Sequence, residues 1–303
     1  MAAMDKLKIA IIVLNYKGLE DTLSCLDSLR RIKRNNFNIE IIVVDNGSGD
    51  GSKEALSNFR DIRLIALEKN LGYSGGNNVG IKEAIKRNSN YLLILNNDTL
   101  VDPNLLTELV NGAKMGDIIS PKIYFAAGYE FHKNRYKKSD LGKVIWYAGG
   151  KIDWENVMGI HIGVDEVDNG QFANRMEIDY ATGACMFVKR EVFEKIGFFN
   201  EKYFLYLEDM DFCVRAKRAG FKIVFGPQAI IWHKNASSSG GSGSRIQDYY
   251  ITRNRLLFSF KYAKLRTKLA VFRQVLTSVA SLSKRQALID FITFNFGKGS
   301  LKL

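Results

Sequence analysis

The stretch Tyr91-Leu-Leu-Ile-Leu-Asn-Asn-Asp98-Thr99 decides the fold class and indicates where the chemistry lies. Its apolar run has the length of a buried strand, and it ends abruptly in two amides and a carboxylate. In an open α/β sheet, ligands bind outside the carboxyl ends of the strands. An acid delivered there by a rigid strand is placed to hold a divalent cation and, through it, a diphosphate. Taken alone, the pattern fits an Asn-rich turn after a strand even better.

Around this stretch, apolar runs alternate with helical patterns over the first 120 residues. We predict strands at residues 8–14, 39–44, 62–67, 91–95 and 117–121, and helices at 21–34, 52–59, 75–87 and from 102 onward. Strands separated by helices form a parallel sheet with right-handed crossovers. The predicted fold class is therefore α/β, with a Rossmann-like, mostly parallel sheet flanked by helices. Residues 124–171 have no clean period and predict long loops or a small antiparallel excursion.

The positive charge of the chain is concentrated at its C-terminal end. The net charge is +12, and residues 253–303 hold eleven Lys or Arg against one acid, Asp290. The positive charge therefore belongs to a basic tail on a near-neutral domain, and the protein is not uniformly basic. We predict one domain over residues 1–252, with a nucleotide-binding half (1–121) and an acceptor and catalytic half (122–252). A basic, amphipathic helical segment is expected over residues 253–303.

Two roles fit this basic tail. Its apolar stripe suits an anionic cytoplasmic membrane surface, and it suits nearly as well a helix pair packed on the domain. No run of about 18 apolar residues occurs, which predicts no transmembrane helix. Three widely spaced cysteines without a metal pattern predict reduced core thiols and a cytoplasmic location. The stripe comprises Leu265, Leu269, Phe272, Val275, Leu276 and Val279.

Polar side chains also follow the first two predicted strands. Asn15 comes directly after the first strand, and Asp45-Asn46 end the second. Asp45 can accept a hydrogen bond from a ring N–H or a hydroxyl of a ligand across the sheet edge; an Asx turn or helix cap is the alternative. Because Asn15 and Asp45 both lie at carboxyl ends of predicted strands, the two residues together favour a ligand-binding site more than either does alone.

A glycine-rich segment, Asn70-Leu-Gly-Tyr-Ser-Gly75-Gly76-Asn77-Asn78, leads into the predicted helix at 75–87. Its glycines let backbone N–H groups approach a phosphate or a ring closely. It meets neither the dinucleotide nor the P-loop motif, so an ordinary glycine turn is the alternative. Further along, the small residues 182–184 are expected on a strand, either as a floor under a bound sugar or for close core packing.

A second acidic cluster is Tyr203-Phe-Leu-Tyr-Leu-Glu208-Asp209-Met-Asp211. Carboxylates this close raise at least one pKa, which suits a general base, whereas the alternative is an acidic helix start favoured by the helix dipole. His233 ends a later strand-like run and is either structural or, as a neutral imidazole, a metal ligand. Residues 237–244, rich in Ser and Gly, predict an inert linker or a mobile lid.

In this order along the chain, the motifs resemble family 2 glycosyltransferases, and more narrowly their bacterial rhamnosyltransferase-like branch. The resemblance runs from about residue 8 to about residue 254, and as a set the motifs are highly specific. It implies a GT-A fold, a nucleotide-diphosphate sugar donor, a divalent cation (Mn²⁺ or Mg²⁺) and inversion at the anomeric carbon. The implied activity is transfer of a sugar, rhamnose being one candidate, to a hydroxyl of a glycan or lipid-linked acceptor in cell-surface polysaccharide synthesis.

The resemblance also implies roles for individual residues. Asp98 would bind the metal, with His233 as a second protein ligand, and Asp209 would be the general base, with Glu208 and Asp211 as its nearest rivals. Asp45 would hold the pyrimidine base of the donor, and Arg253, in the segment Tyr249-Tyr-Ile-Thr-Arg253-Asn254, could stabilise the leaving diphosphate. The remaining donor-binding candidates are Asn15, Asn46, Gly75, Gly76, Asn77 and Asn97.

One departure from the broader family lies in the metal motif. Many members have two acids there, and this chain has Asn96-Asn97-Asp98, which implies a metal held jointly with the donor phosphates.

Two other classes of function are alternatives to the transferase. One is a catalytically silent protein that binds nucleotide sugars; the other is a nucleic-acid binder, suggested by the charge but without any RNA or DNA motif. We therefore expect a sugar donor and no nucleic acid as partner.

Overall fold

The structure is a computed structural model, and it describes residues 6–132, 134–235 and 243–301. Its centre is a ten-stranded sheet in the order β10-β12-β6-β11-β4-β1-β2-β3, with β5 paired to β12 and β7 to β6. The strands of the first half are β1 (Leu7–Asn15), β2 (Phe37–Asp45), β3 (Arg63–Ala66), β4 (Tyr91–Asn96), β5 (Thr99–Val101) and β6 (Ile118–Phe125). Those of the second half are β7 (Ile145–Tyr147), β10 (Met176–Glu177), β11 (Cys185–Lys189) and β12 (Ile223–His233).

The sheet is mostly parallel, as predicted. Strands β3, β2, β1 and β4 run parallel to one another, and β6 and β12 form a second parallel pair. Strand β11 lies antiparallel between β4 and β6 and joins the two groups. Its first residue, Cys185, therefore lies at the carboxyl edge of β4, where the backbone N–H of Asn96 donates to the carbonyl of Ala184.

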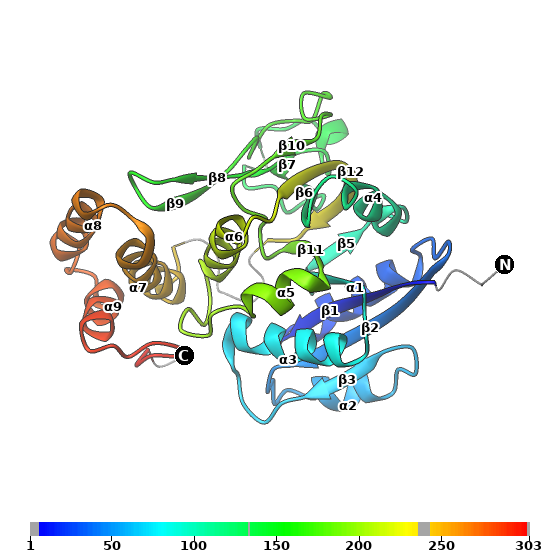
Figure 1. Cartoon of the computed structure of the whole chain (residues 1–303), viewed down its shortest axis with the longest axis horizontal. Coiled ribbons are helices and arrows are strands. Elements are labelled where there is room, and N and C mark those ends of the chain that lie inside the picture. Colours follow the sequence, from blue (N-terminus) through cyan, green and yellow to red (C-terminus); the bar gives the residue numbers. More distant parts are fainter. Residues whose placement is uncertain (1–5, 133, 236–242, 302–303) are drawn as a thin grey trace.

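The central strands are buried because helices cover both faces of the sheet (Figure 1). The runs Ile9–Val13 and Leu92–Leu95 are almost completely buried, which is why they are continuously apolar rather than alternating. Helix α3 (Gly72–Lys86) can approach the sheet closely because position 80 is a glycine: a Cβ there would lie 2.6 Å from Cγ2 of Ile12. The other helices of this half are α1 (Leu19–Arg30), α2 (Ser52–Ser57) and α4 (Leu105–Gly112).

The stretch predicted as long loops or a small antiparallel excursion, residues 124–171, begins at the end of β6 and contains few regular elements. It holds the 3-10 turn η1 (Lys138–Asp140) and a two-stranded antiparallel sheet of β8 (Gly150–Asp153) and β9 (Met158–His161). After β11, the chain forms α5 (Arg190–Ile196) and α6 (Glu208–Arg218) before it returns to the sheet as β12.

Three helices end the chain: α7 (Arg245–Tyr262), α8 (Leu265–Thr277) and α9 (Leu282–Ile292), so the predicted helical tail is confirmed. They pack on one another to one side of the sheet (Figure 1). The predicted boundary at 252/253 falls inside α7, which is continuous across it. In the part of the chain that the structure describes, no helix is both long and apolar enough to cross a membrane.

Two local predictions differ from the structure. Helix α3 begins at Gly72, so Gly75, Gly76 and Asn77 lie inside a helix and not in a turn before it. Residues 182–184 precede strand β11 and do not lie on it. Of the segment predicted as a linker or lid, 237–244, residues 237–242 lie outside the described residues, and Ser244 is the N-cap of α7. The three cysteines are buried and unpaired, as predicted.

Candidate active site

Strand register places the sequence-predicted donor residues at one edge of the sheet. Asn15 pairs with Asp45 at the ends of β1 and β2, and Asn96 at the end of β4 lies opposite Leu14. Because these strands are parallel, their carboxyl ends lie at the same edge, as the sequence predicted.

Asn15 and Asp45 form one buried polar network. The Asn15 amide donates to Oδ1 of Asp45 at 2.7 Å, and the Ser48 hydroxyl donates to the same oxygen at 2.5 Å. The Thr22 hydroxyl donates to Oδ1 of Asn15 at 2.8 Å and fixes the orientation of that amide. Asp45 is only 3 % exposed, so its carboxylate is held rigidly at the strand end. Such an acid is ready to accept a ring N–H from a ligand at the sheet edge.

Asn46 and Gly76 take mainly packing roles in the structure. The Asn46 amide donates to the carbonyl of Gly72, and its oxygen accepts from the backbone N–H of Leu71, which ties β2 to the start of α3. A Cβ at Gly76 would lie 2.4 Å from Cδ1 of Leu14, so this glycine lets α3 approach the end of β1. Gly75 is tight for a different reason, since a Cβ there would lie 2.8 Å from Cβ of Leu71.

Asn77 and Asn97 differ in how their amides are used. Asn77 donates to the carbonyl of Tyr73, while its Oδ1 is buried without a hydrogen-bond partner among the described residues. Asn97 donates to the carbonyl of Gly18 and to the Thr22 hydroxyl, so it fastens the turn after β4 to the start of α1. These contacts keep the neighbouring Asp98 in a fixed position.

Asp98 and His233 meet although 135 residues separate them. The pairing of β5 with β12 sets His233 opposite Thr99, and Nε2 of His233 lies 3.0 Å from Oδ1 of Asp98. Both side chains are about 5 % exposed. Burial disfavours the charged form of Asp98, but the nearby His233 and Lys234 outweigh burial, and the pKa of Asp98 is lowered.

The pair offers a metal one carboxylate and one imidazole. Over the described residues, no group of three or more His, Cys, Asp or Glu side chains could hold a metal ion. A cation at Asp98 and His233 would therefore complete its coordination with ligand oxygens, in keeping with the single acid of the sequence motif.

The second acidic cluster begins helix α6. Oδ2 of Asp209 accepts from the backbone N–H of Gly183 at 2.9 Å, and Oδ1 accepts from the N–H of Met210 at 2.8 Å. The Tyr73 hydroxyl donates to the carbonyl of Gly183 at 2.5 Å. Residues 182–184 thus link helix α3 of the nucleotide half to the acids of α6.

The Tyr73 hydroxyl is connected to the second acidic cluster through Gly183. Its pKa is raised well above the usual value, mainly by burial and further by the charges of Glu208, Asp209 and Asp98. Tyr73 and Gly183 lie within sequence motifs, but the sequence alone indicates no role for either of them. A Tyr inside a glycine-rich helix start was the available signal, and only the tertiary fold shows what its hydroxyl contacts.

Glu208 and Asp209 differ in their surroundings. Glu208 is buried, and its Oε2 has no hydrogen-bond partner within the described part of the chain. Burial and the charge of Asp209 raise the pKa of Glu208 well above its usual range. Burial also raises the pKa of Asp209, but the N–H groups of Gly183 and Met210 stabilise its anion and limit the rise. When one proton is shared by this pair, we expect it on Glu208.

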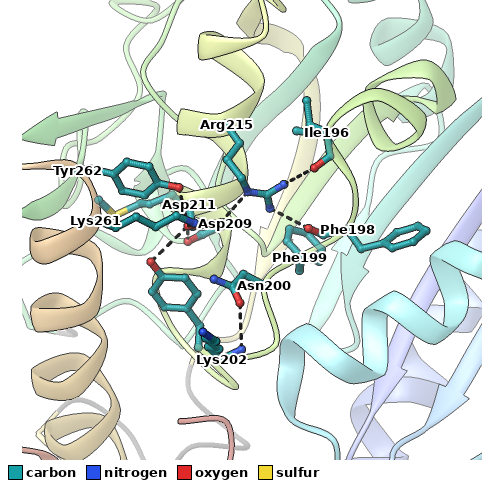
Figure 2. A network of polar contacts seen from close by, with 12 residues as sticks. Ile196, Phe198, Phe199, Asn200, Lys202, Asp209, Asp211, Arg215, Lys261 and Tyr262 are labelled. Carbon is teal, nitrogen blue, oxygen red and sulfur yellow. Dashed lines mark hydrogen bonds and ion pairs between the residues drawn. The ribbon is translucent and has the colours of Figure 1, made fainter. Parts of the chain in front are cut away.

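Asp211 is the centre of a structural network (Figure 2). Its buried carboxylate accepts from Nε of Arg215 and Nζ of Lys261, both at 2.8 Å, and from the Tyr262 hydroxyl at 2.7 Å. Burial opposes the charge, but Lys261, Arg215 and Tyr262 together lower the pKa of Asp211. Because Lys261 and Tyr262 belong to α7, Asp211 anchors that helix on α6. These contacts favour a structural role for Asp211 over the predicted role as a rival base.

Arg253 lies in the interior, not at the sheet edge. Its side chain is 0 % exposed, and Nη2 donates to the carbonyls of Lys202 and Tyr203. The guanidinium carbon lies 5.3 and 5.1 Å from the ring centres of Tyr249 and Tyr250. The predicted contact of Arg253 with a leaving diphosphate therefore gains no support from its position.

Comparison with known proteins gives the family. The model of glycosyl transferase family 2 matches residues 9–197, more than half of the chain. A hexosyltransferase of low-salt glycan biosynthesis, Agl10 of Haloferax volcanii, is 30% identical over 254 residues, 83% of this chain and 75% of its own length. The N-acetylglucosaminyl-diphospho-decaprenol L-rhamnosyltransferase of Mycobacterium tuberculosis is 25% identical over 67% of this chain and 68% of its own.

Solved structures show the same fold at low sequence identity. GalNAc-T7 with UDP, GalNAc and Mn²⁺ superposes with a TM-score of 0.63 at 14% identity, over 88% of this chain and 55% of that one. The mannosyltransferase PcManGT of Pyrobaculum calidifontis, with GDP-Man and Mn²⁺, gives 0.54 at 14% identity, over 94% and 79%. The predicted GT-A fold is thereby confirmed. The chain belongs to glycosyl transferase family 2, whose members transfer sugars in glycan and polysaccharide biosynthesis.

Proposed function

We propose that this protein is an inverting, metal-dependent glycosyltransferase. It would move a sugar from a nucleotide-diphosphate donor to a hydroxyl of a glycan or lipid-linked acceptor. The observation that carries the proposal is that residues 183 and 184 connect the two acidic groups: the N–H of Gly183 donates to Asp209, and the carbonyl of Ala184 accepts from the N–H of Asn96, two residues before Asp98. The rhamnosyltransferase among the relatives makes a rhamnose donor the first to test.

An inverting transfer needs one base, one face of attack and stabilisation of the leaving diphosphate. We assign the base to Asp209, because two backbone N–H groups favour its ionised form while Glu208 retains the shared proton. A carboxylate whose pKa is raised by burial is a stronger base, and Asp209 can then take the proton of the acceptor hydroxyl. No covalent nucleophile is needed.

Asp98 and His233 fit a divalent cation such as Mn²⁺ or Mg²⁺. A carboxylate oxygen and an imidazole nitrogen suit Mn²⁺, whereas Mg²⁺ would lean more on oxygen ligands from the donor. When bound, the cation would neutralise charge on the departing diphosphate. The protein's part is to hold Asp98 in place, through Asn97 and through the N–H of Lys234, which donates to the Asp98 carbonyl.

Donor binding tests this proposal directly. We expect one of the nucleotide sugars (dTDP-rhamnose, UDP-hexoses, UDP-N-acetylhexosamines or GDP-sugars) to raise the Tm when Mn²⁺ is present, since a ligand at 100 times its Kd stabilises by about 2.7 kcal/mol. EDTA or Asp98→Ala should remove most of this rise, whereas the exposed Asp27→Asn should keep it. An equal affinity for the donor with and without metal in the wild type would contradict the role of Asp98. Donor binding without any turnover would favour the silent binding protein.

The proposal includes a contact with the inner face of the cell membrane, through α8 and α9. Leu265, Leu269 and Leu282 are 61–71 % exposed, and Leu276, Ile289 and Ile292 are also exposed. The predicted stripe is therefore divided: Val275 faces inward and is buried, while the leucines face outward. Exposed cations accompany the outward face, and the one acid between 264 and 301, Asp290, is buried. Apolar side chains among cations suit an anionic lipid surface.

Vesicle sedimentation tests the membrane contact. We expect the protein to sediment with vesicles that contain anionic phosphatidylglycerol more than with neutral phosphatidylcholine vesicles, and less as salt is raised. Replacing Leu265, Leu269 and Leu282 together by Ser should lower the bound fraction at least about fivefold, because the apolar part of the contact is lost. Met115→Ser, at an exposed apolar residue of the catalytic domain, is the matched control. Unchanged sedimentation of the triple variant would contradict a membrane contact through α8 and α9.

A further inference from the structure

The backbone that carries the two candidate base residues is left-handed at three positions. In the 203–207 loop, which directly precedes Glu208, the φ angles are 64° at Phe204, 68° at Tyr206 and 68° at Leu207. Residues with a Cβ adopt this region at a cost, and such a conformation persists only where the surroundings enforce it. Leu207 is also the N-cap of α6, so the loop sets the direction in which this helix presents its acids.

The enforcing contacts come from helix α7. The Asn254 amide nitrogen lies 2.8, 2.7 and 2.9 Å from the carbonyl oxygens of Tyr203, Leu205 and Tyr206, and it donates to this group of three. Oδ1 of Asn254 accepts from Nε and Nη2 of Arg253, which fixes the amide in this orientation. Both side chains are 0 % exposed, so every polar atom they offer is directed at the protein.

Arg253 also holds the loop in place by hydrogen bonds. Its Nη2 donates to the carbonyls of Lys202 and Tyr203, and its Nη1 donates to the Tyr249 hydroxyl. That hydroxyl in turn donates to Asp290 of α9. The Tyr249 hydroxyl therefore connects the buried positive charge of Arg253 to the negative charge of Asp290. A charge this deeply buried is retained only with such satisfaction of its donors.

The opposite side of the loop rests on the nucleotide half. The carbonyl of Phe204 accepts from the N–H of Ser74 at the start of α3, whereas the Phe204 ring stacks on Tyr250 of α7 with centroids 5.2 Å apart. A Cβ at Gly72 would lie 2.5 Å from Phe204, so that glycine makes room for the loop. The loop is thus held between α7 and the helix that bears Tyr73.

We propose that Arg253 and Asn254 are positioning residues, which hold the 203–207 loop in the left-handed form that aims Asp209 at the acceptor hydroxyl. The inference rests on the proposed function for the base, but its geometry is independent of the sugar transferred. It replaces the leaving-group role that the sequence suggested for Arg253. The C-terminal helices are then a working part of the catalytic domain and not an appendage.

Two measurements on Asn254→Ala test this role. Hydrogen–deuterium exchange of residues 203–211 should become at least about fivefold faster, and kcat should fall at least about tenfold while the KM for the donor stays within twofold. Arg253→Lys, which keeps the charge but loses the fork of donors, should give the same pattern more mildly. Arg255→Ala is the matched control, because its guanidinium donates to Asn156 and Gln274 and does not contact the loop.

A second substitution separates positioning from a general loss of folding. Because glycine adopts the left-handed region freely, Leu207→Gly added to Asn254→Ala should recover part of the lost kcat. An unchanged kcat, or a raised donor KM with normal kcat, would overturn the positioning role, as would unchanged exchange of the loop. If the wild type transfers no sugar from any donor, the proposed function fails, and the exchange measurement still decides whether Asn254 holds the loop.

Discussion

Asp209→Asn is expected to reduce the rate of sugar transfer by about 10³-fold, within the range that a general base contributes. Asn keeps the size of the side chain, and its oxygen can still accept from the N–H of Gly183, so the loop around it should stay in place. The measurement is kcat together with calorimetric binding of the nucleotide in the presence of Mn²⁺. Nucleotide affinity should be unchanged. Normal turnover in this variant would disprove the assignment of the base.

Glu208→Gln is the matched control for Asp209→Asn. If Glu208 carries the shared proton, Gln imitates the protonated acid, and we expect kcat to fall less than about tenfold. Burial raises the pKa of Asp209, so kcat should rise with pH along a limb that lies above the ordinary carboxyl range. Glu208→Gln should leave this limb in place. A loss of activity in Glu208→Gln larger than in Asp209→Asn would make Glu208 the base.

Asp211→Asn is expected to lower the free energy of unfolding by about 3 kcal/mol, because it leaves Arg215 and Lys261 without their buried counter-charge. The same change removes an anchor of α7 on α6. In thermal unfolding, we expect a fall in Tm of about 5–10 °C. Asp27→Asn, which breaks an exposed pair with Arg30, should cost less than about 0.5 kcal/mol.

The effect of Asp211→Asn should depend on pH with a definite sign. The folded pKa of Asp211 is lowered, so its contribution is present above the unfolded pKa of about 3.9 and disappears as the pH falls through the folded value. Wild type and variant should therefore differ fully at neutral pH and converge in acid. A difference in stability that is the same at pH 7 and pH 3 would contradict an electrostatic anchor.

The sheet and its carboxyl edge could be predicted because their signals are local. Continuous apolar runs such as 91–95 can only be strands or buried helices, and the helical patterns between them decide in favour of parallel strands. Once the strands are parallel, the register brings Asn15 and Asp45 together without further information. The meeting of Asp98 with His233 required the family resemblance, since no local pattern connects residues 135 positions apart.

The placement of Arg253 and Asp211 could not be predicted from the sequence. Arginine is a residue type that binds anionic ligand groups, and an acid beside Asp209 has the residue type of a general base. A linear pattern cannot show that both side chains already make their contacts with other groups of the protein. Helix α7 brings Lys261 to Asp211, and it brings Arg253 to the carbonyl of Tyr203. Each contact joins segments about 50 residues apart, and burial, which only the fold determines, makes them structural.

The position of β11 and α7 bears on how the enzyme is made. Strand β11 pairs with β4 across ninety residues, Cys185 opposite Leu95, so the nucleotide half can leave the ribosome long before its sheet is completed. Asn254, which grips the loop beneath Asp209, emerges later still. During synthesis, the donor edge would form first and the base would be aligned last. A nascent chain would then be able to hold a sugar donor before it could transfer the sugar, and transfer would begin only after helix α7 has left the ribosome.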